Sequence, residues 1–260
     1  MSDFIQYAVA DGVATVTINR PDKKNAMSFA MLGQFIETVK KAGEDPAARV
    51  VIVTGVPGAF CAGTDLSDLA SIPGAQRGLR GTAEDRGRWW PIVECPLPVI
   101  GAIDGAAVGM GAEFATQCDI RIATPRARFA WNFVHRGLVP DTGAGSWLLP
   151  RLIGSGQALR LLYTGDFLPA QEALDLGFVH QLVEPDELLN TARTLALAIA
   201  KGSPFSQKRI KTLVYEGLAS PVDEHMQRHT KALAECFRSD DHREGVASFL
   251  ERREAQFTGK

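Results

Sequence analysis

Runs of apolar residues divide the first two-thirds of the chain into short strands and helices. The segments QYAVA and VATVTINR flank Asp11-Gly12, and this pattern predicts a β-hairpin over residues 5–20. Residues 50–54 (VVIVT) and 99–103 (VIGAI) are short and wholly apolar. Such runs are typical of strands buried on both faces of a sheet. We therefore expect a buried sheet in this part of the chain.

Helical periodicity appears between these strands and dominates the end of the chain. Five apolar residues recur at helical spacing after Ser28, which predicts a capped helix over residues 29–41. From residue 185 to 257 the pattern is helical, with breaks near 202–204, 220–221 and 239–240. We predict an α/β fold class with a core domain of residues 1–183 and a helical C-terminal region of residues 184–260.

Composition excludes several classes of protein. The 260 residues carry a net charge of −2 without a basic block, so we expect no nucleic-acid partner. No apolar run approaches the roughly 20 residues of a membrane span, and the N-terminus lacks the layout of a signal peptide. The scattered cysteines predict neither a metal site nor a disulfide framework. We expect a cytoplasmic protein. The cysteines are Cys61, Cys95, Cys118 and Cys236.

The stretch of residues 98–119 carries the first candidate chemistry. A short strand leads through Gly105, Gly109 and Gly111 into a helix with Glu113 in its first turn. A helix start of this kind points backbone N–H groups and a positive dipole end at whatever lies in front of it. A carbonyl oxygen that gains negative charge is one candidate occupant. The alternative is a tight strand-to-helix connection with a solvated Glu113.

A glycine- and arginine-rich segment, residues 71–88, precedes that stretch. We interpret it as a surface loop, with a lid over a substrate pocket as the alternative. Trp89 follows it and is a candidate pocket residue.

Five blocks of sequence, in order, resemble the enoyl-CoA hydratase/isomerase (crotonase) superfamily. Together they reach from the first hairpin to the C-terminus. The blocks are TINRPDKKNAM (17–27), FCAGTDL (60–66), PVIGAIDGAAVGMGAEFATQCDI (98–120), RFAWNFVHRGLVPDTGAGSWLLPRLIG (128–154) and EGVASFLERREAQFTGK (244–260).

The resemblance implies a crotonase-like spiral of ββα repeats with a helical C-terminal trimerisation region. It also implies a homotrimer or a dimer of trimers. The implied partner is an acyl-CoA thioester substrate, and no cofactor is implied beyond the coenzyme A that this substrate carries. By position in the motifs, the backbone N–H groups of Ala62 and Met110 would form the oxyanion hole that stabilises a thioester enolate.

Hydratases of this family use two glutamates. The resemblance places the first on Glu113 and the second on Phe133, which cannot transfer a proton and is therefore a pocket residue here. Asp141 lies eight residues further on, where similar isomerases and dehalogenases carry an aspartate. We therefore take Glu113 and Asp141 as the catalytic candidates. The alternative for Asp141 is a cap for a helix that begins near Gly143.

For coenzyme A, the resemblance suggests basic residues of the opening loop and of the C-terminal helix, the latter often from a neighbouring subunit. These are Lys23, Lys24 and Arg252. Asp65 and the backbone around Ala62 are expected near the adenine and pantetheine groups.

The implied function is enoyl-CoA hydration, with the double bond of a 2-enoyl-CoA as target. One alternative is an enoyl-CoA or ring-epoxide acyl-CoA isomerase that uses Asp141. A second is a hydrolytic or dehalogenating enzyme with Asp141 as nucleophile, and a third is a non-catalytic acyl-CoA-binding protein.

Overall fold

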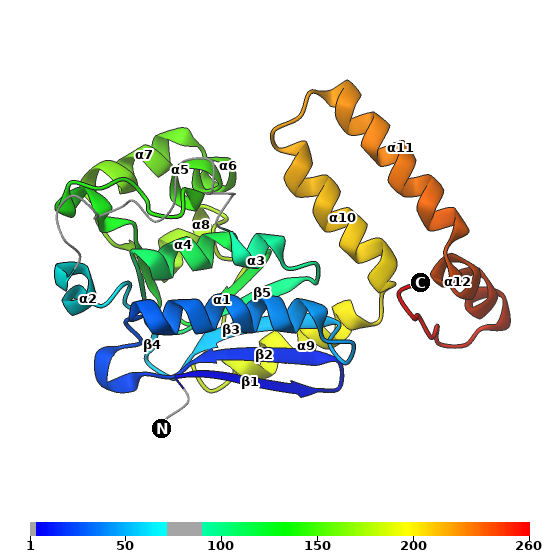
Figure 1. The fold of residues 1–260 in the computed structure, drawn as a ribbon, viewed down its shortest axis with the longest axis horizontal. Coiled ribbons are helices and arrows are strands. Elements are labelled where there is room, and N and C mark those ends of the chain that lie inside the picture. The colour runs from blue at the N-terminus through cyan, green and yellow to red at the C-terminus, as the bar shows by residue number, and fades with distance from the viewer. Residues whose placement is uncertain (1–3, 72–89) are drawn as a thin grey trace.

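The computed structural model describes residues 4–71 and 90–260, and it begins with the predicted hairpin (Figure 1). Strands β1 (Ile5–Ala10) and β2 (Val13–Ile18) pair antiparallel along their full length. Asp11 and Gly12 between them have φ angles of 51° and 78°. Positive φ at both central residues is what the tight hairpin turn requires, and Asp-Gly tolerates it. The predicted hairpin is confirmed.

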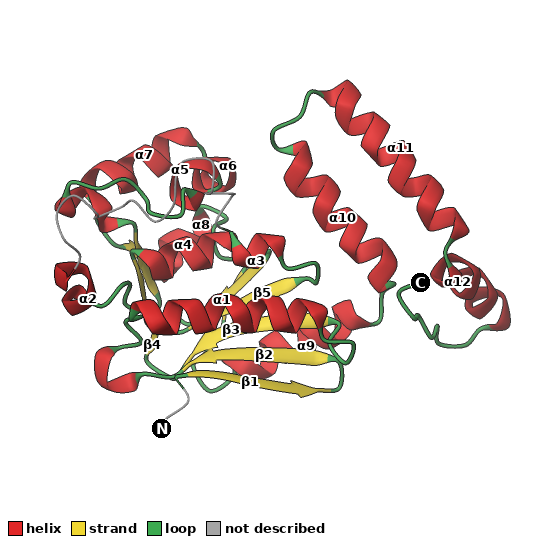
Figure 2. Ribbon diagram, viewed as in Figure 1, coloured by secondary structure: helices red, strands yellow, loops and turns green. Residues whose placement is uncertain are grey.

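Two sheets form the centre of the molecule (Figure 2). In the six-stranded sheet, of order β1-β2-β3-β5-β7-β10, every pairing beyond the hairpin is parallel. The four-stranded sheet has the order β4-β6-β8-β9, and only its last pairing is antiparallel. The strands not yet placed are β3 (Val50–Gly55), β4 (Ala59–Cys61), β5 (Val99–Ile103), β6 (Ala106–Val108), β7 (Ile120–Ala123), β8 (Arg128–Ala130), β9 (Leu168–Pro169) and β10 (Gln181–Leu182).

Helices cover both faces of the larger sheet. Val51 and Val53 of β3 belong to the main core, together with α1 (Phe29–Glu44) and α4 (Met110–Gln117). Val50 and Ile52 point to the other face and pack with α9 (Leu188–Ala200). Alternate residues of one strand therefore serve two cores, which explains why β3 is wholly apolar. Ser28 caps α1 as predicted, because its hydroxyl accepts a hydrogen bond from the Met31 N–H at 3.2 Å.

The C-terminal helices beyond α9 form an arm at one side of this body (Figure 1), and the first of them contacts the body through Lys211 and Tyr215, which both bind Asp119. The sequence-based division at residue 183 groups α9 with the tail, whereas in the structure α9 packs on the sheet and the arm begins at α10. Ser203 and Ser239 cap two arm helices near the predicted breaks. Within the described residues, no helix is both long and apolar enough to cross a membrane. The arm helices are α10 (Pro204–Gly217), α11 (Val222–Arg238) and α12 (Asp240–Glu251).

Shorter elements surround the smaller sheet. They are the 3-10 helices η1 (Pro21–Lys23) and η3 (Asn132–Arg136) and the α-helices α2 (Leu66–Ser71), α3 (Pro91–Glu94), α5 (Ala144–Trp147), α6 (Leu149–Ile153), α7 (Ser155–Thr164) and α8 (Ala170–Asp175).

Two glycines should respond to alanine in opposite ways. Gly105 joins the two sheets at φ 68°, and a Cβ there would meet the Gly58 carbonyl oxygen at 2.1 Å. Gly105→Ala should therefore lower the free energy of unfolding by at least about 2 kcal/mol. Gly33 is exposed within α1 with open space around it, so Gly33→Ala should raise stability by about 0.5–1 kcal/mol. Urea denaturation of both variants checks this, and equal stabilities would contradict it.

Candidate active site

Three parallel strand ends bring the candidate residues together. Strands β4, β6 and β8 pair in parallel, with Cys61 opposite Ala107 and Val108 opposite Ala130. The segments that follow these strands must therefore leave the sheet at the same edge. They carry the glycine loop of residues 62–65, the start of α4 and η3. A Cβ placed on Gly63 would lie only 3.9 Å from the backbone nitrogen of Met110, so the glycine loop contacts the start of α4.

At this edge, the backbone N–H groups of Thr64 and Met110 are among those that have no acceptor among the described residues. Met110 is the first residue of α4, so its N–H has no partner within the helix. Thr64 bridges Met27, but the bonds of that bridge use the Gly63 carbonyl and the Asp65 N–H. The Thr64 N–H therefore faces away from Met27.

The predicted donor Ala62 is not free. Its N–H donates to the Lys24 carbonyl oxygen at 3.1 Å, so it ties the glycine loop to the opening loop instead. Gly63, at φ 99°, interrupts the extended backbone between Ala62 and Thr64, and the Thr64 N–H has no such acceptor among the described residues. The sequence does not show the bridge between residues 27 and 64, so the direction of each N–H group in this loop could not be predicted from it.

Glu113 lies in the first turn of α4 with 0% of its surface exposed, so the solvated alternative is wrong. Its Oε1 accepts a hydrogen bond from the Gly145 N–H at 2.8 Å, and its Oε2 lies 2.5 Å from the Thr142 hydroxyl. Burial, and secondarily the charge of Asp141, raises the pKa of Glu113 to about 8. At neutral pH this carboxyl group therefore holds a proton and can act as an acid.

Asp141 is brought beside Glu113 by the loop that follows η3. It directly precedes Thr142, and its charge acts on Glu113. Although Asp141 is exposed, the surrounding protein atoms partly desolvate its carboxyl group and raise its pKa to about 6. The helix-cap alternative fails, because Gly143 occupies the N-cap of α5 without a side-chain bond, and the Ala144 N–H donates to Thr142. Asp141 is therefore available as a base near neutral pH.

Phe133 forms an apolar wall at the entrance of α4. It is buried in η3, and its ring lies 3.9 Å from the built position of a Cβ on Gly109. A hydrocarbon ring thus occupies the position to which the sequence resemblance assigns the second glutamate of the hydratases. Trp89, the other predicted pocket residue, and the segment of residues 71–88 lie outside the described residues, except for the single position Ser71 that ends α2.

The predicted coenzyme A residues fall into two separate groups. The exposed Lys23 and Lys24 lie in the opening loop, whose backbone binds the glycine loop. Asp65 lies nearby, but Arg20 at 2.9 Å and the Ser67 hydroxyl at 2.6 Å occupy its carboxylate. Arg252 is the C-cap of α12, which lies in the arm (Figure 1). Within one chain, Arg252 therefore lies apart from Lys23 and Lys24.

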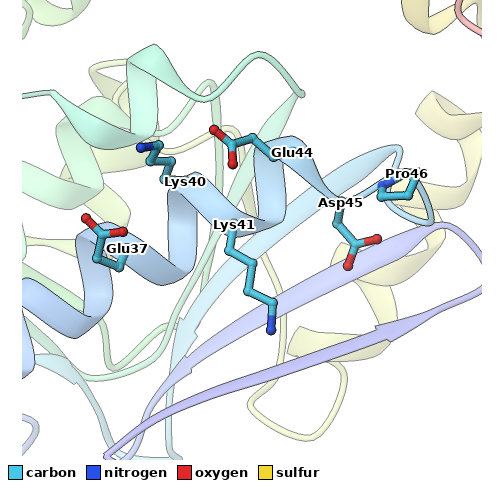
Figure 3. Close-up of a pocket in the computed structure, with 6 residues that line it drawn as sticks. All are labelled: Glu37, Lys40, Lys41, Glu44, Asp45 and Pro46. Atoms are coloured by element: carbon cyan, nitrogen blue, oxygen red, sulfur yellow. The ribbon is translucent and has the colours of Figure 1, made fainter.

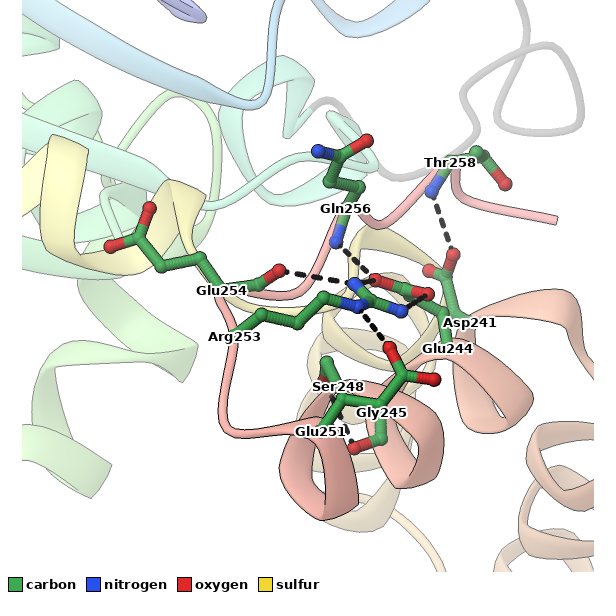
Figure 4. Close-up of polar contacts among 9 residues, drawn as sticks. All are labelled: Asp241, Glu244, Gly245, Ser248, Glu251, Arg253, Glu254, Gln256 and Thr258. Atoms are coloured by element: carbon green, nitrogen blue, oxygen red, sulfur yellow. Dashed lines mark hydrogen bonds and ion pairs between the residues drawn. The ribbon is translucent and has the colours of Figure 1, made fainter.

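The chain end beside Arg252 is fixed by a compact polar cluster (Figure 4). Arg253 binds Glu244 and Glu251, and the Asp241 carboxylate accepts from the Thr258 N–H at 2.8 Å. The tail therefore packs back on α12 in a defined conformation.

Two hollows in the described surface lie away from Glu113. One, of about 420 Å³, is lined at the end of α1 by Lys40, Glu44 and neighbouring polar side chains (Figure 3). The other, of about 310 Å³, lies in the arm between α10, α11 and the C-terminus. Charged linings do not suit an acyl chain, so neither hollow competes with the site at α4. The described residues contain no cluster of three or more acidic, histidine or cysteine side chains that would hold a metal ion.

The raised pKa of Glu113 makes stability depend on pH. Between the ordinary value of 4.5 and about 8, the folded state keeps a proton that the unfolded chain releases. Unfolding thus releases a proton, and this stabilisation, complete below pH 4.5, is lost as the pH rises towards 8. As the pH rises, the free energy of unfolding should fall more steeply in the wild type than in Glu113→Gln. The difference between the two slopes should be up to about 1.4 kcal/mol per pH unit. Urea denaturation at pH 6, 7 and 8 measures this difference.

The exposed Glu37→Gln serves as the matched control and should retain the wild-type slope. Parallel slopes for wild type and Glu113→Gln would show that Glu113 is ionised in the folded protein.

Comparison with known proteins gives matches over nearly the whole chain. The family model described as enoyl-CoA hydratase/isomerase matches residues 8–260. The chain is 36% identical to the 1,2-epoxyphenylacetyl-CoA isomerase of Escherichia coli over the full length of both proteins. It is 35% identical to the short-chain-enoyl-CoA hydratase of Clostridium acetobutylicum, over 94% of this chain and 93% of that protein. The crystal structure of an enoyl-CoA hydratase from Bacillus anthracis matches with a TM-score of 0.90 and 32% identity, over 99% of this chain and all of the other.

Proposed function

Because the chain belongs to the enoyl-CoA hydratase/isomerase family, we propose that it moves a double bond within an acyl-CoA thioester, using Asp141 and Glu113 as proton carriers. The fold is the crotonase-like α/β fold expected from the sequence. The chain is an acyl-CoA-processing enzyme of the hydratase/isomerase type, so the non-catalytic alternative is set aside. What remains to be proposed is the reaction and its residues.

The thioester oxygen of the substrate would bind between the N–H groups of Thr64 and Met110. These donors face the same edge of the sheet and lack protein acceptors among the described residues. Two fixed backbone donors stabilise the negative charge that develops on the oxygen when a neighbouring carbon loses a proton. Met110 also places the positive end of the α4 dipole at that oxygen.

One observation carries the choice of isomerisation: the interacting pair of Glu113 and Asp141 can exchange protons, while the buried ring of Phe133 offers no second glutamate to hold a water molecule. With pKa values of about 6 and about 8, Asp141 is ionised and Glu113 is protonated near pH 7. Asp141 would remove a proton from one carbon, the charge would pass to the thioester oxygen, and Glu113 would protonate the other carbon. One C–H bond breaks and another forms, so no cofactor is needed beyond the coenzyme A of the substrate. Proton exchange with water resets the pair.

Hydration of a 2-enoyl-CoA is the second candidate. It is favoured by the relatives named short-chain-enoyl-CoA hydratase and crotonyl-CoA hydratase. Two carboxylates must then hold a water molecule between them, and the apolar ring of Phe133 offers no polar atom for this task. Phe133 therefore ranks hydration behind isomerisation.

Incubation with a 3-enoyl-CoA tests the proposal. Isomerisation yields a conjugated 2-enoyl-CoA of unchanged mass, which chromatography and mass spectrometry identify. A ring-epoxide acyl-CoA is the second substrate to try, because the Escherichia coli relative is named for one. Product that gains the mass of one water from a 2-enoyl-CoA, without any isomerisation, would support hydration instead.

The arm supports a proposal about assembly. Its helices expose many large apolar side chains, and α10 and α11 bury none of their own residues fully. Burial against other copies of the chain would remove this surface from water, as expected for a homotrimer or a dimer of trimers. A neighbouring Arg252 could then join Lys23 and Lys24 at the phosphates of coenzyme A. The exposed residues are Ile210, Val214, Leu218, Val222, Met226, Leu233, Phe237, Val246, Phe249 and Leu250.

A further inference from the structure

The hydroxyl group of Thr142 lies between two buried polar side chains. It is 2.5 Å from Glu113 Oε2, and it accepts hydrogen bonds from the Ala144 N–H at 3.2 Å and from Gln117 Nε2 at 3.4 Å. The backbone of Thr142 is fixed as well, because its carbonyl oxygen accepts from Trp90 Nε1 at 2.9 Å. Thr142 therefore has little freedom to leave Glu113.

The side-chain amide of Gln117 is only partly hydrogen-bonded. The residue has 0% of its surface exposed, and its Oε1 has no hydrogen-bond partner among the described residues. A buried carbonyl oxygen without a donor is costly. A half-turn of the amide would exchange Oε1 and Nε2 with almost no change of shape, and Oε1 would then face the Thr142 hydroxyl.

The two orientations of the Gln117 amide match the two protonation states of Glu113. A hydroxyl group has one proton to donate and two lone pairs. When Glu113 is ionised, Thr142 donates to it and accepts from Gln117. When Glu113 is protonated, Glu113 donates to Thr142, and the proton of Thr142 needs another acceptor. The turned amide of Gln117 supplies that acceptor, so the Thr142 hydroxyl is paired in both protonation states of Glu113.

We infer that Thr142 and Gln117 are positioning residues that form a reversible hydrogen-bond relay, which holds the Glu113 carboxyl group in place in both of its protonation states. Among the described residues, Asp141 is the charged group that acts on Glu113. The Glu113 carboxyl group is bonded to the Thr142 hydroxyl and the Gly145 N–H, and the Ala144 N–H also faces it. The role of the relay in turnover rests on the proposed isomerisation, whereas the relay itself does not.

The relay predicts shifts of opposite sign for its two members. Thr142→Val removes the donor to ionised Glu113, so the midpoint of the Glu113 titration should rise by about one pH unit. Gln117→Leu removes the acceptor that serves protonated Glu113, so the midpoint should fall. Thr142→Ser keeps the hydroxyl group and should restore the wild-type midpoint.

Infrared spectroscopy of the full-length protein measures this midpoint directly. The carbonyl stretch of protonated Glu113 is the band that disappears in Glu113→Gln, and its amplitude is followed against pH. Opposite shifts in the two variants, with Thr142→Ser near wild type, are the expected result. Unchanged midpoints, or shifts of the same sign, would overturn the relay. Because the band needs no turnover, this result is independent of whether the enzyme isomerises or hydrates. If Thr142→Val fails to fold, a midpoint in Gln117→Leu that does not fall overturns the relay by itself.

Discussion

Replacement of Asp141 with asparagine should reduce the rate constant for isomerisation by about 10³-fold and leave acyl-CoA binding nearly unchanged. Asparagine keeps the size and polarity of the side chain but cannot take a proton, and positioned proton transfer is typically worth 10²–10⁴-fold. The backbone donors that bind the thioester are on other segments and stay intact. Single-turnover kinetics measures the chemical step, and calorimetry with an unreactive saturated acyl-CoA measures binding.

Asp166→Asn is the matched control, because Asp166 is an exposed aspartate in the loop after α7. It should retain the wild-type rate. An Asp141→Asn enzyme with a rate within a few-fold of wild type would remove Asp141 from the mechanism.

Replacement of Glu113 with glutamine should lower kcat by about 10²–10³-fold and also change the pH profile. In the wild type, kcat/KM should rise as Asp141 ionises near pH 6 and fall as Glu113 ionises near pH 8. The two groups interact, so both limbs report the pair as well as each residue. Glutamine can accept the Gly145 bond but cannot deliver a proton, so the residual activity should keep the acid limb and lose the alkaline one.

The pH profile separates this role from a packing role. A Glu113→Gln enzyme that is slower but retains both limbs would mean that another group with a pKa near 8 supplies the proton. A wild-type profile without an alkaline limb would mean that Glu113 works in its ionised form.

Much of the fold followed from local pattern. The hairpin at Asp11-Gly12, the Ser28-capped helix and the apolar strands β3 and β5 were predicted because each carries its own signal over five or more residues. Strands β4 and β6 were missed. Each has three residues beside glycines, and they exist because they pair with each other, a contact that no periodicity records.

The site was predictable where a side chain carries the chemistry and less so where the backbone does. The sequence indicates Glu113 and Asp141 as catalytic candidates, and the structure places them close enough for the charge of Asp141 to act on Glu113. The sequence indicates the N–H of Ala62, which in the structure binds the Lys24 carbonyl oxygen, because the direction of an N–H group depends on contacts such as the bridge between Met27 and Thr64. Thr142 and Gln117 were missed, since ordinary polar residues gain a role only from what they contact.

The central claim is that Asp141 and Glu113 transfer protons between two carbons of a thioester bound by the N–H groups of Thr64 and Met110. The most direct test offers wild-type enzyme a 3-enoyl-CoA and, separately, a 2-enoyl-CoA in deuterated water, and follows the products by mass spectrometry. We expect conversion of the 3-enoyl-CoA to its conjugated isomer, with deuterium incorporated at carbon and no added water. Hydration of the 2-enoyl-CoA, with the 3-enoyl-CoA returned unchanged and free of deuterium, would contradict the account.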